Sequence, residues 1–109
     1  MAYDERLYEA LVERLGATPG LTEKKMFGGI CFLLNGNMLA GVMRGGGMAR
    51  VGKDREAEAL ELDGVVAFSA TGRKMGGLVH FSADAMEDEA VIGPLLSLAF
   101  AFVGALPAK

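Results

Sequence analysis

The segment from Gly47 to Lys53, GMARVGK, comes close to the phosphate-binding loop GxxxxGK[ST], in which backbone N–H groups and a lysine surround nucleotide phosphates. The last position of the motif does not fit, because Asp54 stands where a Ser or Thr hydroxyl would hold Mg²⁺. Residues 48–51 also favour a short strand over a loop wrapped around a phosphate. Because the chain contains 16 glycines, a near match of this kind arises easily. We therefore interpret the segment as a turn followed by a strand.

The remaining residue types with chemical potential are isolated from one another. His80 is the single histidine and alternates with Leu78 and Ser82 on a predicted strand, so no metal cluster and no Cys/His nucleophile pair follows from the spacing. Cys31 lies in an apolar run, where a small buried thiol is the ordinary interpretation. We predict no catalytic residue, no metal site and no cofactor, and an enzyme is the least favoured of the possible functions.

Basic residues are concentrated in the middle of the sequence. Between Thr22 and Lys53 there are five positive residues against one acid, Glu23, and Arg73-Lys74 adds two more in a glycine-rich segment. Such segregation can create a local positive potential on a net acidic protein. The alternative is that these side chains are ordinary solvated strand ends. The residues of the hypothetical anion-binding site are Lys24, Lys25, Arg50, Lys53, Arg73 and Lys74.

Length and charge limit the classes of function. A chain of 109 residues with 51% hydrophobic residues can form one globular domain, and residues 1–109 are treated as a single unit. The net charge of -3 argues against strong direct binding to nucleic acid, which draws on concentrated Lys and Arg. The acidic, polar start MAYDERLYE is unlike a secretory signal, and one cysteine excludes an intramolecular disulfide. We expect a cytoplasmic protein.

The first half of the sequence predicts a helix and a hairpin. Residues 3–15 carry leucines four apart with charged residues between them, and Gly16 with Thr18-Pro19-Gly20 ends this helix. Asn35-Gly36 between apolar runs predicts a type I′ turn, since both central residues need φ > 0. Gly28-Gly29 is interpreted as a bulge or bend, where the missing side chains let the strand coil or let another backbone approach. The predicted cross-strand pairs are Leu34 with Asn37, Leu33 with Met38, Phe32 with Leu39, Cys31 with Ala40 and Ile30 with Gly41.

The second half predicts shorter elements and a long final helix. We expect a strand over 48–51, a short helix over 54–62, strands over 65–69 and 78–82 with a loop over 71–77 between them, and a helix over 88–106.

No charged residue occurs from 90 to 108, so the final helix is apolar nearly all round. Gly93-Pro94 is expected to leave only 95–106 uninterrupted, and twelve residues at about 1.5 Å each span roughly 18 Å, too short for a membrane. One face should cover the sheet and the other should meet a partner, most simply a second copy of the chain. We predict a homodimer that uses Leu96, Phe100 and Val103 or their neighbours.

Several motifs together resemble the amino-terminal domain of TfoX/Sxy-type proteins, which are bacterial regulators of natural competence, and its stand-alone relatives. The matching residues are Thr22-Glu23-Lys24-Lys25-Met26-Phe27-Gly28-Gly29, Phe32, Asn35-Gly36-Asn37-Met38, Gly41-Val42, Arg50-Val51-Gly52-Lys53, Phe68, Thr71-Gly72-Arg73-Met75-Gly77, and Ala99-Phe100-Ala101-Phe102 to Leu106-Pro107. The resemblance implies an α+β fold: a strongly bent antiparallel sheet with an N-terminal helix, a short middle helix and a long C-terminal helix.

The resemblance implies less about activity. It is consistent with a non-enzymatic interaction module that acts as a regulator or coactivator in transcriptional control and contacts a protein partner. The alternative is a small-anion or nucleotide-binding protein that uses the basic loops. In its last helix the chain departs from its relatives, which usually carry charged residues where this sequence has Leu96-Ser97-Leu98 and Val103-Gly104.

Overall fold

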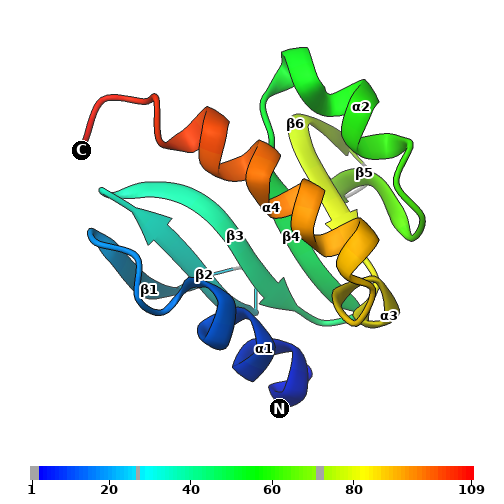
Figure 1. Ribbon diagram of the computed structural model, residues 1–109, viewed down its shortest axis with the longest axis horizontal. Coiled ribbons are helices and arrows are strands. Elements are labelled where there is room, and N and C mark those ends of the chain that lie inside the picture. Colours follow the sequence, from blue (N-terminus) through cyan, green and yellow to red (C-terminus); the bar gives the residue numbers. More distant parts are fainter. Residues whose placement is uncertain (1–2, 27, 71–72) are drawn as a thin grey trace.

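A computed structural model describes residues 3–26, 28–70 and 73–109; the side chains of residues 26, 69–70 and 73–75 also lie outside this description. The chain forms one open six-stranded antiparallel sheet in the order β1-β2-β3-β4-β6-β5. Helices α1 and α4 cross it on one side, with α2 beside β6 and β5 (Figure 1). The predicted α+β class and its bent antiparallel sheet are confirmed. The strands are β1 (Leu21–Met26), β2 (Gly29–Leu34), β3 (Asn37–Met43), β4 (Gly46–Arg50), β5 (Val65–Ala70) and β6 (Arg73–Phe81).

The helices begin and end close to the predicted positions. They are α1 (Glu5–Leu15), a 3-10 turn η1 (Lys53–Arg55) leading into α2 (Glu56–Leu60), α3 (Ala83–Met86) and α4 (Glu89–Val103). The short helix α3, which begins at the N-cap Ser82, was not expected from the sequence. Asp88 caps α4 by accepting a hydrogen bond from the Ala90 N–H at 3.0 Å.

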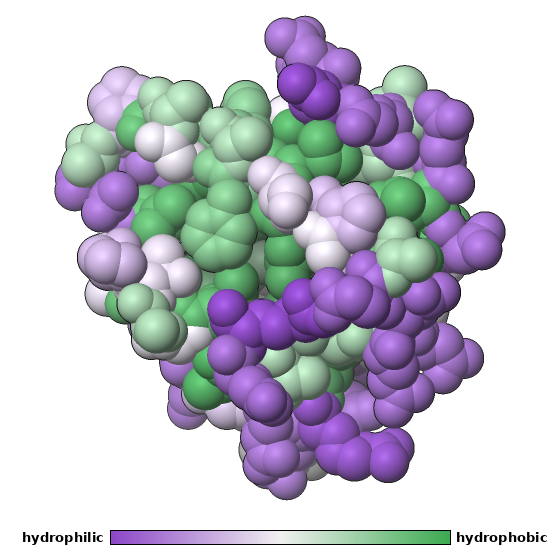
Figure 2. Space-filling view, viewed as in Figure 1, coloured by the Kyte–Doolittle hydropathy of each residue, from purple (hydrophilic) through white to green (hydrophobic). Residues whose placement is uncertain are grey.

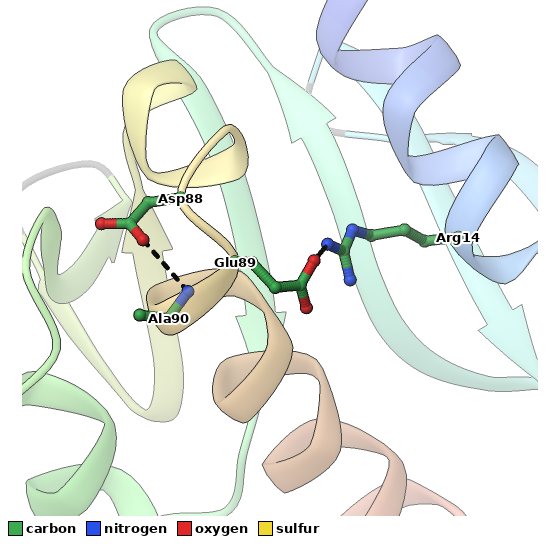
Figure 3. A network of polar contacts seen from close by, with 4 residues as sticks. All are labelled: Arg14, Asp88, Glu89 and Ala90. Atoms are coloured by element: carbon green, nitrogen blue, oxygen red, sulfur yellow. Dashed lines mark hydrogen bonds and ion pairs between the residues drawn. The ribbon is translucent and has the colours of Figure 1, made fainter.

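An ion pair fastens α1 to the start of α4. Arg14 of α1 donates to the carboxylate of Glu89, next to the Asp88 cap (Figure 3). The pair joins two elements that are adjacent in space and 75 residues apart in sequence. Since both side chains are partly or largely solvated, we expect it to define the position of α1 more than to add stability.

Pro94 does not interrupt α4, contrary to the expectation that only residues 95–106 would be uninterrupted. It lies in the second turn, where it removes a single backbone hydrogen bond. Val91 and Ile92 before it and Leu95 and Leu96 after it are all buried, so packing holds the helix on both sides of the proline. Among the described residues, no helix is both long and apolar enough to cross a membrane.

The main core lies between the helices and the sheet. Leu11, Phe32, Ile92 and Leu95 are almost completely buried in it, together with Phe81 of β6. The opposite side of the sheet carries a smaller cluster, Met48, Phe68 and Leu78, with Met38 and Met43 partly buried beside it. Both sides of the sheet therefore carry apolar clusters, and Met38, Met43 and Met48 help to fill the smaller one.

The predicted pairing of β2 with β3 is confirmed next to the turn and is wrong farther from it. Leu34 pairs with Asn37 and Leu33 with Met38, but the register then shifts and Phe32 pairs with Ala40. Leu39 is thus an extra residue on β3, and both Leu39 and Ala40 belong to the main core. The bulge places two successive side chains on the helix side, which a regular alternation cannot do. The pairs predicted for Phe32, Cys31 and Ile30 are each displaced by one residue for this reason.

The predicted loop over 71–77 is wrong in part. Residues 71–72 lie outside the described part of the chain, but β6 already begins at Arg73, which pairs with Ala70. The register of β5 and β6 changes from Ala67 with Val79 to Ser69 with Lys74. Residues 75–78 of β6 therefore stand opposite the single residue Phe68. Glycines at 76 and 77 permit this irregularity, since Gly77 adopts φ +84.

The Asn35-Gly36 turn has the predicted conformation, with φ of 52 at Asn35 and 85 at Gly36. The end of the chain also docks against it: the Lys109 N–H donates to the Asn35 carbonyl, and the buried Asn37 side chain donates to the Pro107 carbonyl, both at 2.9 Å. Asn37 is the single buried polar residue of the described side chains, and this bond satisfies it.

Replacing Gly36 by Val should destabilise the protein by roughly 1–3 kcal/mol, because a β-branched residue resists positive φ. Urea denaturation followed by circular dichroism measures the change. A Gly36→Asn variant is the control, because Asn tolerates the left-handed region and should lose less stability. Equal stability of the Val variant and the wild type would contradict the structural role of this turn.

Candidate binding pocket

A pocket of about 550 Å³ lies where the end of β4, the irregular part of β6 and α4 meet. Residues 50–55 line one side, Gly76 and Gly77 of β6 form another, and α4 supplies an apolar wall of Leu98, Ala101 and Phe102. Its volume falls in the range of small-molecule sites, which are usually concave and mostly apolar with a few polar groups.

The turn of the chain around the pocket depends on two glycines, Gly52 and Gly77. The Gly77 carbonyl accepts hydrogen bonds from the N–H groups of Val51 and Gly52, at 2.9 and 3.1 Å, and the Gly77 N–H donates to the Glu56 carboxylate at 2.8 Å. At Gly52, which has φ +85, a Cβ would lie 2.4 Å from the Phe102 ring. At Gly77 it would lie 3.2 Å from the backbone of residues 52 and 53. The backbone and the Phe102 ring can approach this closely because Gly52 and Gly77 have no side chain.

Arg50 and Lys53 provide the positive charge of the pocket. The guanidinium carbon of Arg50 lies 5.5 Å from the centre of the Phe102 ring, a cation–π distance. The Lys53 chain runs over Gly76, where an added Cβ would lie 3.1 Å from its Cε. Neither forms an ion pair with any side chain that the structure describes. Arg55 also lines the pocket but is paired with Glu58 at 3.0 Å.

The structure brings together only part of the predicted anion-binding set. Arg50 and Lys53 share the pocket, whereas Lys24 and Lys25 belong to β1, an edge strand separated from β4 by β2 and β3. Lys24 pairs with Cys31 and Lys25 with Ile30, so the two lysines point to opposite sides of the sheet. The side chains of Arg73 and Lys74 lie outside the described residues. Anion binding itself stays a prediction.

Sequence reasoning did not identify the apolar half of the pocket. Leu98, Ala101 and Phe102 belong to α4 and follow Lys53 by 45, 48 and 49 residues in the sequence. No local pattern distinguishes them from core residues of the same helix. The near match GMARVGK was a partial signal, since its last residues do reach the pocket although Gly47–Arg50 is strand.

The other predicted chemical candidates have structural roles. His80 pairs with Met48 across the sheet, and its Nε2 lies 3.1 Å from the Gly45 carbonyl oxygen. Burial raises the pKa of the Cys31 thiol to about 11, so this thiol stays protonated and unreactive at neutral pH. On α1, the Tyr8 hydroxyl donates to Glu23 at 2.7 Å, and this bond raises the tyrosine pKa. No group of three or more potential metal ligands occurs among the described residues.

The residues suggested for a dimer interface lie mainly inside the protomer. Leu96 and Val103 expose 5% and 1% of their surface, because this side of α4 packs against the sheet, and Phe100 is half-buried. The large hydrophobic residues of α4 and its C-terminal extension that are half-buried are Leu98, Phe100, Phe102 and Leu106, which we call the α4 patch. Figure 2 shows hydrophobic surface gathered over this helix, with hydrophilic residues around it.

Comparison with known proteins gives one assignment. The TfoX N-terminal domain family matches residues 13–103, and no curated protein and no solved structure shows a significant match. The matched region contains all six strands and extends from within α1 to the last residue of α4. It also includes all residues that line the pocket. The chain therefore belongs to the TfoX N-terminal domain family.

Proposed function

We propose that this chain is a non-enzymatic interaction module that takes part in transcriptional control by contacting a protein partner. The observation that carries the proposal is the α4 patch, in which four large hydrophobic side chains stay partly exposed on a stretch without charged residues. Hydrophobic surface with a polar rim is typical of protein contact sites (Figure 2). Membership of the TfoX N-terminal domain family supports the regulatory role.

The proposal is tested by comparing transcripts in host cells that lack the gene and in cells complemented with variants. Wild-type protein should restore the transcript levels, whereas Phe100→Glu should not, because a charge in the patch opposes desolvation by the partner. Val66→Glu is the matched control: Val66 is 55% exposed on β5 and lies on the opposite side of the sheet. Thermal melting verifies that both variants are folded.

Two outcomes would contradict the proposal. Deletion of the gene could leave transcript levels unchanged, which would remove the regulatory role. Alternatively, a folded Phe100→Glu protein could restore the transcripts as well as the wild type, which would remove the α4 patch as the contact surface.

We also expect the protein to form a homodimer through the α4 patch, as the simplest way to cover this surface. Sedimentation at micromolar concentration should give twice the chain mass of 11.4 kDa. Phe100→Glu should shift the mass to that of one chain, and Val66→Glu should not. A wild-type monomer at these concentrations would count against the dimer while leaving contact with a different protein open to the transcript experiment.

A further inference from the structure

Two cations with no carboxylate partner among the described side chains face one mostly apolar pocket. The guanidinium of Arg50 lies within cation–π distance of the Phe102 ring, a contact that does not use its N–H groups as hydrogen-bond donors. Lys53 lies across Gly76 at the same pocket. Positive groups in such a setting favour an anionic ligand, and the surrounding apolar walls strengthen the attraction by excluding water.

The remaining lining defines the rest of the ligand. Val51 is completely buried, while Leu98 and Phe102 are half-buried and Ala101 is exposed, so the α4 side offers a hydrophobic surface that a ligand could cover. A purely inorganic anion would leave this wall in contact with water. An organic ligand with a flat or branched apolar body would cover it and gain the corresponding hydrophobic free energy.

The charge of the ligand is limited by an acid at the same site. Asp54 lines the pocket beside Lys53, and Arg55 is already paired with Glu58. A dianion or a polyphosphate would bring several negative charges to two available cations, Arg50 and Lys53, while the Asp54 carboxylate repels it. A ligand with a single carboxylate brings one negative charge, which the Arg50 and Lys53 pair can hold.

From these observations we infer that the pocket between Arg50, Lys53 and α4 binds a small organic monocarboxylate with an aromatic or branched apolar body. The Arg50 and Lys53 donors hold the carboxylate, and the body rests on Leu98, Ala101 and Phe102. The ligand site shares Leu98 and Phe102 with the α4 patch. Phe100 does not line the pocket, so Phe100→Glu tests the protein contact without replacing a pocket residue.

The direct test is NMR titration of the ¹⁵N-labelled protein with phenylacetate up to about 20 mM, since ligands of this size bind with affinities down to millimolar. Saturable shifts are expected at the amides of Gly52, Gly76 and Gly77. Phenylacetamide, which has the same shape without the charge, should bind at least tenfold more weakly. Acetate, which lacks the body, should also bind at least tenfold more weakly.

Variants assign the binding to this pocket. Arg50→Gln and Lys53→Gln should each weaken phenylacetate binding at least fivefold, and Lys53 is exposed, so its variant should fold normally. Arg44→Gln is the matched control, because it removes the same charge from an exposed turn residue that does not line the pocket. It should leave the affinity unchanged.

Three results would overturn the inference. The first is the absence of saturable shifts with phenylacetate, and the second is an equal loss of affinity in Arg44→Gln and Arg50→Gln, which would indicate diffuse charge attraction. The third is tighter binding of phenyl phosphate than of phenylacetate, which would assign the site to phosphate esters. None of these results bears on the Phe100→Glu transcript experiment, so the two ideas can fail separately.

Discussion

Replacing Gly29 by Ala is expected to destabilise the protein by about 3 kcal/mol, a large effect for one added methyl group. The Cβ would lie 1.9 Å from the Val42 carbonyl oxygen and 2.8 Å from its carbonyl carbon. Both belong to the backbone of β3, which is paired with β2 on one side and with β4 on the other. The strand can move away only by breaking ladder hydrogen bonds, so the clash cannot be relieved cheaply.

The neighbouring Gly28 provides a matched control for this prediction. It has φ +75, but no atom lies within 4 Å of the position of its Cβ. Gly28→Ala should therefore lose only the cost of a left-handed backbone, about 1 kcal/mol. Denaturant titration of both variants separates backbone conformation from close approach. If Gly28→Ala were the more damaging change, the interpretation of Gly29 as a site of close backbone approach would be wrong.

Gly28 and Gly29 illustrate which features of the fold can be predicted from the sequence and which cannot. The pair was interpreted as a bulge or bend that lets the strand coil or lets another backbone approach, and Gly29 meets the second description at Val42. The sequence could not say which residue of β3 approaches, because that depends on the one-residue bulge at Leu39. A bulge changes which side chains share a side without changing the apolar character of the run, so the composition of β3 carries no signal for it.

The pocket was harder to predict than the fold for a related reason. Arg50 and Lys53 could be recognised as basic residues near a turn, but their position beside Phe102 depends on how α4 crosses the sheet. Gly77 reaches the backbone of Val51 and Gly52 because β6 pairs with β4, and neither segment alone indicates this long-range pairing. In the sequence Lys24 and Lys25 could not be distinguished from Arg50 as candidates. In the structure β1 lies at the edge of the sheet, and β2 and β3 separate it from β4.

The second large effect is expected at Phe81, which is fully buried and pairs with Gly47 across β4 and β6. Phe81→Ala should lose about 3–5 kcal/mol because it leaves a cavity in the main core. Gly47→Ala should also destabilise, by about 2 kcal/mol, since its Cβ would lie 2.4 Å from the Cζ atom of the Phe81 ring.

The double variant Gly47→Ala, Phe81→Ala separates the cost of the cavity from the cost of the clash with the ring. When Phe81 is truncated, the methyl group at position 47 enters the space that the ring left, so the combined loss should be smaller than the sum by about 1–2 kcal/mol. The rescue should be incomplete, because the Gly41 carbonyl oxygen also lies 2.9 Å from the added Cβ and does not move with the ring.

Phe81→Leu serves as a milder background if Phe81→Ala does not fold. Gly28→Ala combined with Phe81→Leu should be additive, since nothing contacts a Cβ at Gly28. Strict additivity of Gly47→Ala with both Phe81 variants would show that the glycine is not required by the ring.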